Sequence, residues 1–210
     1  MKSPEHPIFL ESVEYIRSQI GFTGLNSVQQ AVLERIIHSS GDLGIQSGLR
    51  FSPDACEKAI NALKKGADIL TDTHMAEAAV SPVSKRTLSS NVKCILEMAP
   101  ELLDSSTQTR SAIGMQKMWL DMTKQQEFWV GPIVLIGSAP SALMTLLDLI
   151  QEGTKKPSLI IGMPVGFIGV AESKTRLLKS DCSHIVLEGS KGGASLAAAT
   201  INALLKAADY

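Results

Sequence analysis

Cysteine is scarce in this sequence of 210 residues: there are only three, Cys56, Cys94 and Cys182, and no two of them form a C-x-x-C pair. So sparse and odd a set argues against a secreted disulfide framework and against a cysteine-rich zinc site. A basic excess is also absent, because 20 basic side chains face 21 acidic ones and the net charge is −1. Proteins that bind nucleic acid normally show such an excess, so we expect no nucleic-acid partner.

Long apolar runs are missing as well. The longest, Leu159–Ala171, is about half the length that spans a bilayer, and it contains Pro164. The segment MKSPEHPIF carries two prolines and a glutamate where a signal peptide has its apolar region. The sequence therefore predicts a reduced, cytoplasmic protein with no membrane partner.

The residues that are present suffice for a folded core. Hydrophobic residues make up 44% of the chain and charged residues 20%, a balance that excludes a disordered or low-complexity chain. Neither a linker nor an internal repeat interrupts the sequence, and its length fits about one domain. We expect a single domain over residues 1–210.

The first third of the chain has helical periodicity. Apolar residues at positions 9, 13, 16 and 20 fall on one face of a helix that ends at Gly21. Ser12 shares this inward face, because it lies three residues after Phe9 and four before Ile16; a hydroxyl is unusual there. Two further helices are expected, one over residues 27–40 and one between Ser52 and Gly66.

From Ala67 onward, short apolar segments alternate with helical ones. The expected strands are Asp68–Thr71, Val92–Leu96, Ile133–Ile136, Leu159–Ile161 and Ile185–Leu187. The expected helices are His74–Val80, Ser111–Met122, Ser141–Gln151, Glu172–Lys179 and Ala194–Ala208. This alternation is typical of βαβ units around a parallel sheet. The fold class is therefore α/β: a three-layer, doubly wound, mostly parallel sheet of about five strands, with N-terminal helices.

Three glycine-bearing turns follow strands at the carboxyl edge of this sheet, where ligands bind in such folds. They begin at Gly137, Gly162 and Gly189. Each precedes a helix, so its backbone N–H groups favour an anionic ligand; the alternative is that glycine only permits a tight turn. The turn from Gly162 to Gly169 matches a dinucleotide-binding fingerprint poorly because Pro164 interrupts it.

His38 is the histidine with the most informative neighbours. On the expected helix 27–40, Ala31, Arg35 and His38 form one stripe, so Arg35 and His38 can face one ligand. Histidine is the natural proton donor near neutral pH, although a lone helical histidine is often an ordinary surface or core side chain. None of the four histidines pairs with another at metal-ligand spacing, and there is no H-E-x-x-H motif, so no metal site is expected.

Several stretches together resemble the precorrin-8X methylmutase (cobalt-precorrin-8 methylmutase) family of cobalamin biosynthesis. They are HPIFLES, RIIHSSG, RFSPDA, KKGADILTD, TRSA, VLIGSAPSAL, IIGMPVGFIGVAESK and GSKGGASLAAATINAL. These stretches follow the family order over essentially the whole chain, and IGMPVGFIGVAESK is the most specific of them. The resemblance implies a flavodoxin-like fold and a homodimer with active sites near the subunit interface.

The resemblance also implies an activity. Family members are isomerases that move a methyl group from carbon 11 to carbon 12 of precorrin-8X or cobalt-precorrin-8, giving hydrogenobyrinate or cobyrinate, by what we interpret as an acid-assisted 1,5-sigmatropic shift. The family's catalytic histidine matches His38. The expected substrate-binding residues are Ser12, Arg35, Asn91, Arg110, Ser111, Gly137, Ser138 and Lys174. No cofactor is expected, since cobalt, if present, is carried by the tetrapyrrole polycarboxylate substrate.

The sequence departs from the family pattern in two places. The stretch from Asn91 to Cys94 is one residue shorter than usual, and Ser138 stands where asparagine is common. Two alternatives remain: a non-catalytic tetrapyrrole-binding carrier, which would need the same pocket but not His38, and a nucleotide-dependent enzyme on the same sheet.

Overall fold

A single six-stranded sheet organises the protein. The computed structural model describes residues 6–101, 108–124 and 129–209. The strands are β1 (Leu49–Phe51), β2 (Ile69–Thr71), β3 (Val92–Cys94), β4 (Ile133–Ile136), β5 (Leu159–Gly162) and β6 (His184–Leu187). Their spatial order is β1-β6-β5-β4-β2-β3, and every pairing is parallel except that of β1 with β6. The five parallel strands alone follow the 2-1-3-4-5 order of the flavodoxin-like fold, which confirms the expected fold class.

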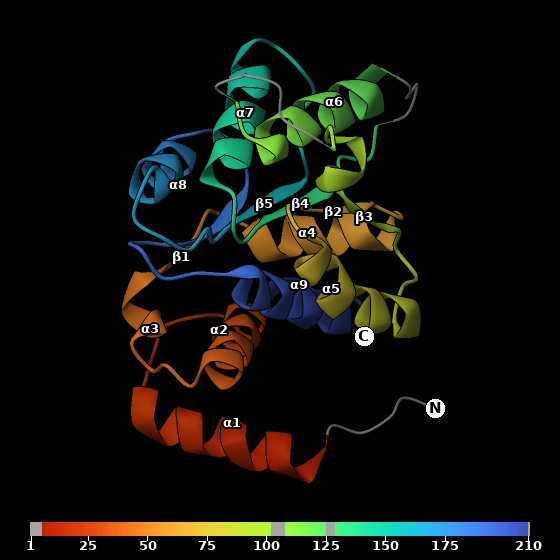
Figure 1. Cartoon of the computed structure of the whole chain (residues 1–210). Coiled ribbons are helices and arrows are strands. Elements are labelled where there is room, and N and C mark those ends of the chain that lie inside the picture. Colours follow the sequence, from red (N-terminus) through yellow and green to blue (C-terminus); the bar gives the residue numbers. More distant parts are fainter. Residues whose placement is uncertain (1–5, 102–107, 125–128, 210) are drawn as a thin grey trace.

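Helices cover both faces of the sheet (Figure 1). Helices α6 (Arg110–Lys124), α7 (Pro140–Gln151) and α8 (Val170–Leu178) lie on one face. The other carries α4 (Ala55–Lys64), α5 (His74–Arg86) and α9 (Ala194–Ala208). Beneath α9 lie α2 (Ser27–Ser40), the short α3 (Ile45–Gly48) and, outermost, α1 (Pro7–Ile20).

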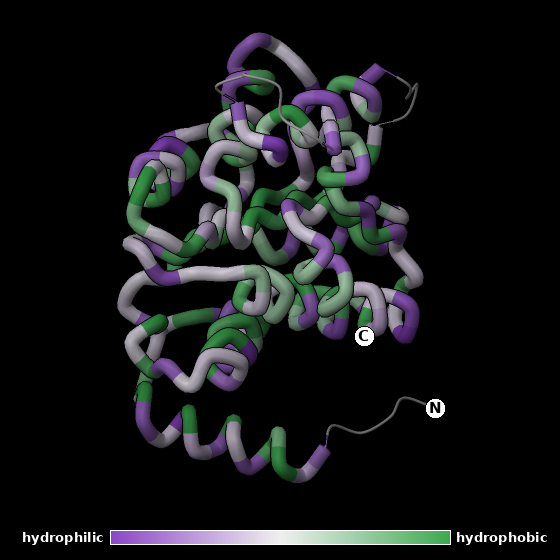
Figure 2. Tube along the Cα trace, viewed as in Figure 1, coloured by the Kyte–Doolittle hydropathy of each residue, from purple (hydrophilic) through white to green (hydrophobic). Residues whose placement is uncertain are grey.

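The strand sequences explain why the sheet is buried on both sides. Side chains alternate between the faces of a strand, and in β4 Ile133 and Leu135 join the core beneath α9 while Val134 and Ile136 join the core beneath α7. All four are fully buried. Figure 2 shows the same concentration of hydrophobic residues in the central strands.

Several elements differ from the sequence-based expectation: α3 was not predicted, and the expected strand Val92–Leu96 ends at Cys94, where the 3-10 helix Ile95–Met98 follows. β1 was not predicted, because three residues at an antiparallel edge are too few to show an alternation signal. Helix α5 does not end near Val80 but continues through Pro82 to Arg86; Val80 and Val83 pack in the core beneath the sheet, and this packing outweighs the lost backbone hydrogen bond. Within the described part of the chain, no helix is long and apolar enough to cross a membrane.

Candidate active site

Helix α1 is attached to α2 by one strong ion pair. Arg17 on α1 donates from Nε and Nη2 to the two carboxylate oxygens of Glu34 on α2, at 2.7 and 3.1 Å. Only 4% of the Glu34 side chain is exposed, and Gln30 Nε2 donates to the same carboxylate at 2.7 Å. Two-point contacts of this kind fix orientation as well as distance, so α1 lies on α2 in a defined register.

That register places the predicted acid beside the predicted serine. The Ser12 hydroxyl on α1 and His38 Nδ1 on α2 lie 2.7 Å apart, and the Phe9 ring meets the imidazole edge-on with centroids 5.0 Å apart. His38 is an exposed residue and Ser12 is half-buried. Because Nδ1 is taken by Ser12, Nε2 is the ring nitrogen that remains for a ligand.

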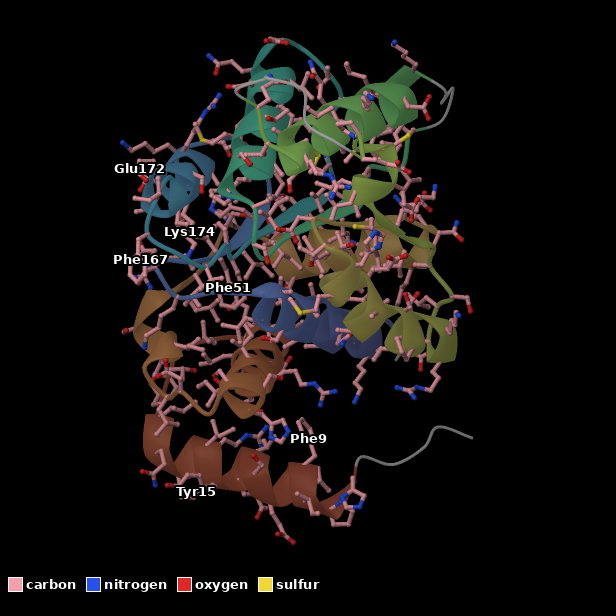
Figure 3. The ribbon with its side chains drawn as sticks, in the orientation of Figure 1. Phe9, Tyr15, Phe51, Phe167, Glu172 and Lys174 are labelled. Carbon is pink, nitrogen blue, oxygen red and sulfur yellow. The ribbon has the colours of Figure 1, made fainter. Side chains whose placement is uncertain are left out.

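Positive charge surrounds Phe9. The Arg35 guanidinium lies 4.7 Å from the Phe9 ring centroid and the Lys206 ammonium lies 5.7 Å from it. Figure 3 shows Phe9 extending from α1 toward α2. Among the described residues, no carboxylate forms an ion pair with Arg35. A cation without an acidic partner is suited to bind a carboxylate of a ligand.

A pocket of about 440 Å³ opens between α1, α2 and α9 next to these groups. Its walls include the apolar side chains of Phe9, Val13 and Val28 together with Arg35 and Lys206. His38 is not part of the lining; it lies on the same stripe of α2, one turn beyond Arg35. Glu14, Arg17 and Glu34 also line the pocket, and Glu34 is paired with Arg17. An apolar pocket in which cations outnumber carboxylates is suited to an anionic, largely apolar ligand.

Six of the predicted substrate-binding residues do not join this group within one chain. Arg110 and Ser111 begin α6, on the opposite face of the sheet from α2. Arg110 Nε donates to the carbonyl of Pro100 at 2.8 Å. Asn91 precedes β3 at the amino edge of the sheet, where its amide donates to Asp68 at 3.2 Å. These contacts tie Arg110 and Asn91 to their own neighbourhoods.

The backbone N–H groups of the turn after β4 are hydrogen-bonded to a side chain of the protein itself. The backbone N–H groups of Gly137, Ser138 and Ala139 all donate to Oδ2 of Asp72, at 3.0, 2.6 and 2.8 Å. A buried carboxylate of the protein thus occupies the position that a substrate anion would take at these N–H groups; substrate binding by Gly137 and Ser138 stays a prediction. Burial raises the pKa of Asp72, and the three hydrogen bonds oppose that rise.

Asp72 is the functional-looking residue that sequence reasoning missed. It stands directly after strand β2, at the carboxyl edge where polar groups gather, and that position was the available signal. Its partner turn lies 65 residues away along the chain, so the sequence alone did not connect the two.

The Lys174 ammonium is likewise hydrogen-bonded within the protein. Its residue is 1% exposed, and its ammonium donates to the carbonyls of Gly189 and Lys191, each at 2.7 Å. Burial lowers the pKa of Lys174 to about 8. Substrate binding by Lys174 stays a prediction; in the structure Lys174, labelled beneath α8 in Figure 3, holds the third glycine turn in place.

The glycine turns serve close backbone packing. A Cβ on Gly137 would stand 2.6 Å from Cα of Ala194, at the start of α9. Only glycine allows α9 to begin so close to the end of β4. Together with the contacts of Asp72 and Lys174, this supports the simpler interpretation of the glycines, which is tight packing and not binding of a nucleotide phosphate.

The fold is that of an α/β enzyme, and the histidine, serine and arginine grouped beside the pocket form its candidate site. The family model for precorrin-8X methylmutase matches residues 7–207. The chain therefore belongs to the precorrin-8X methylmutase family, whose members are isomerases of the intramolecular transferase type.

Individual relatives are similar to this chain along nearly their full lengths. The chain is 35% identical to the cobalt-precorrin-8 methylmutase of Synechocystis sp., covering 96% of this chain and 95% of the relative. It is 36% identical to the precorrin-8X methylmutase of Pseudomonas aeruginosa, covering 94% and 93%. A crystal structure of precorrin-8x methyl mutase from Thermus thermophilus superposes with a TM-score of 0.85 at 32% identity, covering 96% of this chain and 95% of that one.

Proposed function

We propose that this protein moves a methyl group from carbon 11 to carbon 12 of precorrin-8X or cobalt-precorrin-8, giving hydrogenobyrinate or cobyrinate, with His38 as the acid. The observation that carries the proposal is the 2.7 Å contact between Ser12 and His38 Nδ1, beside a pocket lined by Arg35 and Lys206. Family membership supplies the reaction class.

The proposed mechanism begins with a proton. In the imidazolium form, Nδ1–H of His38 donates to the Ser12 hydroxyl, which leaves Nε2–H to protonate a nitrogen of the bound macrocycle. Protonation withdraws electron density from the conjugated ring. The bond from the methyl to carbon 11 then breaks as the bond to carbon 12 forms in a 1,5-shift, and the proton returns to His38.

This chemistry is balanced within the substrate. Product and substrate are isomers, so the proposed reaction requires no methyl donor and no redox cofactor, and any cobalt stays in the macrocycle. The carboxylates on the rim of the substrate give Arg35 its role, because a guanidinium binds a carboxylate through two parallel hydrogen bonds. The pocket of about 440 Å³ would hold one edge of the ring system.

We also propose that the protein acts as a homodimer with active sites near the interface. Phe167 and Ile168, in the loop after β5, are 87% and 90% exposed, and Phe167 projects from the edge of the molecule in Figure 3. Such side chains favour burial against a partner. Light scattering should report a dimer, and Phe167→Asp should shift it to monomer; a dimer unchanged by this variant would place the interface elsewhere.

The central experiment measures turnover of precorrin-8X in stoichiometric excess by the change in chromophore absorbance. His38→Ala should lower kcat by about 10²–10⁴-fold, the usual contribution of general acid catalysis. His6→Asn is the matched control, because asparagine preserves the helix cap that His6 provides at the start of α1. An unchanged kcat in His38→Ala would remove the mechanism, and binding of precorrin-8X by the wild-type protein without any conversion would indicate a carrier.

A second experiment separates binding from chemistry. Arg35→Ala should raise KM by about tenfold or more, since it removes a charge-assisted contact worth roughly 1.5–3 kcal/mol. Arg86→Ala, an exposed arginine at the end of α5, should leave KM unchanged. Equal effects of the two substitutions would show that Arg35 does not contact the substrate.

A further inference from the structure

A second group of chemically reactive side chains lies apart from the α1–α2 site, where β2 and β3 end. His74 begins α5, and Glu77 follows on the next turn of the same helix. Cys94 is the last residue of β3 and pairs in register with Thr71, the last residue of β2. The fold thus brings one imidazole, one carboxylate and one thiol together from two separate elements.

The distances within this group are short. His74 Nδ1 lies 2.8 Å from Glu77 Oε2, and one ligand atom from each of His74, Glu77 and Cys94 lies within 4.8 Å of the others. Tetrahedral zinc, with bonds of about 2.0–2.3 Å, places its ligand atoms roughly 3–4 Å apart. A small side-chain rotation is therefore enough to bring all three onto one ion.

The donor set is selective in its chemistry. Imidazole nitrogen, thiolate sulfur and a carboxylate oxygen are the three ligand types that zinc takes in proteins. Magnesium and calcium prefer sets made only of oxygen, so a thiol in the group argues against them. Cys94 is fully buried, whereas the His74 side chain is 62% exposed, which gives an ion a route from solvent to the thiol.

The surroundings carry negative charge that a cation would neutralise. Asp72 directly follows Thr71, which pairs in register with Cys94, so Asp72 lies beside the group in the fold. Asp72 is fully buried, and among the described residues its Oδ1 has no hydrogen-bond partner. An unpartnered buried carboxylate oxygen close to such a group is a second, independent sign that a positive ligand belongs there.

We propose that His74, Glu77 and Cys94 bind one zinc-like transition-metal ion, which ties the first turn of α5 to edge strand β3. The sequence predicted no metal site because its histidines do not pair with one another, and these donors meet only in the folded chain. The site is independent of the proposed acid His38, which lies on α2.

The experiment titrates the purified protein with Zn²⁺ against a chromophoric chelator. We expect one Zn²⁺ per chain and a higher thermal unfolding temperature with excess Zn²⁺. Mutation of residues that only hydrogen-bond the metal ligands lowers metal affinity 10–100-fold. His74→Ala and Cys94→Ala remove ligands themselves, so each should lower the Zn²⁺ affinity by at least about 100-fold. The controls His6→Asn and Cys182→Ala should bind as wild type does, because His6 is also exposed and Cys182 is also a buried free thiol.

Cobalt gives a readout of the sulfur ligand itself. Co²⁺ added to the wild type should produce thiolate-to-metal absorption in the near ultraviolet, and Cys94→Ala should abolish it. If Cys94→Ala does not fold, the exposed His74→Ala variant still decides the question through Zn²⁺ affinity. Equal Zn²⁺ affinity in wild type and His74→Ala, or no Zn²⁺ binding by the wild type, would overturn the proposal.

Discussion

The carboxyl edge of the sheet and the α1–α2 surface hold polar groups of similar kinds but use them differently. At the sheet edge, Asp72 accepts three backbone N–H groups and Lys174 donates to two carbonyls. On the α1–α2 surface, His38 contacts Ser12 through Nδ1, and the Arg35 guanidinium lies over the Phe9 ring. The first set is buried, whereas His38 and Arg35 retain contact with solvent.

This difference shows why position in the fold is an incomplete guide to function. Ligands of doubly wound sheets usually bind at the carboxyl edge, and the glycine turns that begin at Gly137, Gly162 and Gly189 were considered as anion sites for that reason. In this chain Asp72 and Lys174 use much of the hydrogen-bonding capacity of that edge within the protein. The polar groups that remain accessible to a ligand, His38 and Arg35, are on helix α2. The comparison predicts that substitutions at the edge affect stability and those on the α1–α2 surface affect activity.

Substitution of Asp72 should cause the largest loss of stability. Asp72→Ala leaves three backbone N–H groups without their acceptor and should lower the free energy of unfolding by roughly 4 kcal/mol. Asp181→Ala is the control, because the Asp181 pair with Lys156 is at the surface and its loss should have no measurable effect. Urea unfolding measures both, and a similar small change in the two variants would contradict the comparison.

Lys174 should make stability depend on pH. Its pKa of about 8 in the fold lies below the ordinary 10.5, so between these values the unfolded chain binds more protons and the free energy of unfolding rises with pH. Relative to Lys174→Met, the wild type should gain roughly 2–3 kcal/mol from pH 8 to 10.5. Taking the difference between the two proteins removes the effect of Cys56, whose pKa burial raises to about 12. If urea unfolding gave the wild type and Lys174→Met the same dependence of the free energy of unfolding on pH, this prediction would be wrong.

The Arg17–Glu34 pair tests whether the register of α1 matters to the site. Among the described residues, Arg17→Ala leaves the buried Glu34 with Gln30 as its remaining partner. It should lower the free energy of unfolding by about 1–2 kcal/mol, between the values for exposed and buried pairs. Because α1 carries Ser12, kcat should fall about tenfold, through loss of orientation of His38. Arg17 also lines the pocket, so KM should rise as well. Glu34→Gln should preserve more activity than Glu34→Ala.

The control for this pair is Arg50→Ala, which breaks the exposed pair of Arg50 with Glu188 and should leave kcat unaltered. Steady-state kinetics of the four variants gives the result. A kcat in Arg17→Ala equal to that of the wild type would show that the site does not depend on the register of α1.

The sequence alone predicted the features that depend on the local pattern of residues, namely the helices and the parallel strands. Periodicity and strand–helix alternation indicated the five parallel strands, because burial of alternate residues leaves a repeating mark on neighbouring positions. His38 and Arg35 were also found in this way, since residues three apart on a helix share a face whatever the rest of the fold. The three-residue edge strand β1 left no such mark.

Only the tertiary structure decided which polar groups meet. Ser12 reaches His38 across 26 residues of chain, and Asp72 fills the turn after β4 across 65; spacing within one element carries no information about either contact. Burial of Lys174 was decided in the same way. The physical reason is that hydrogen-bond partners and loss of solvent depend on which elements pack together, whereas helix and strand formation depends mainly on residues that are neighbours in the chain.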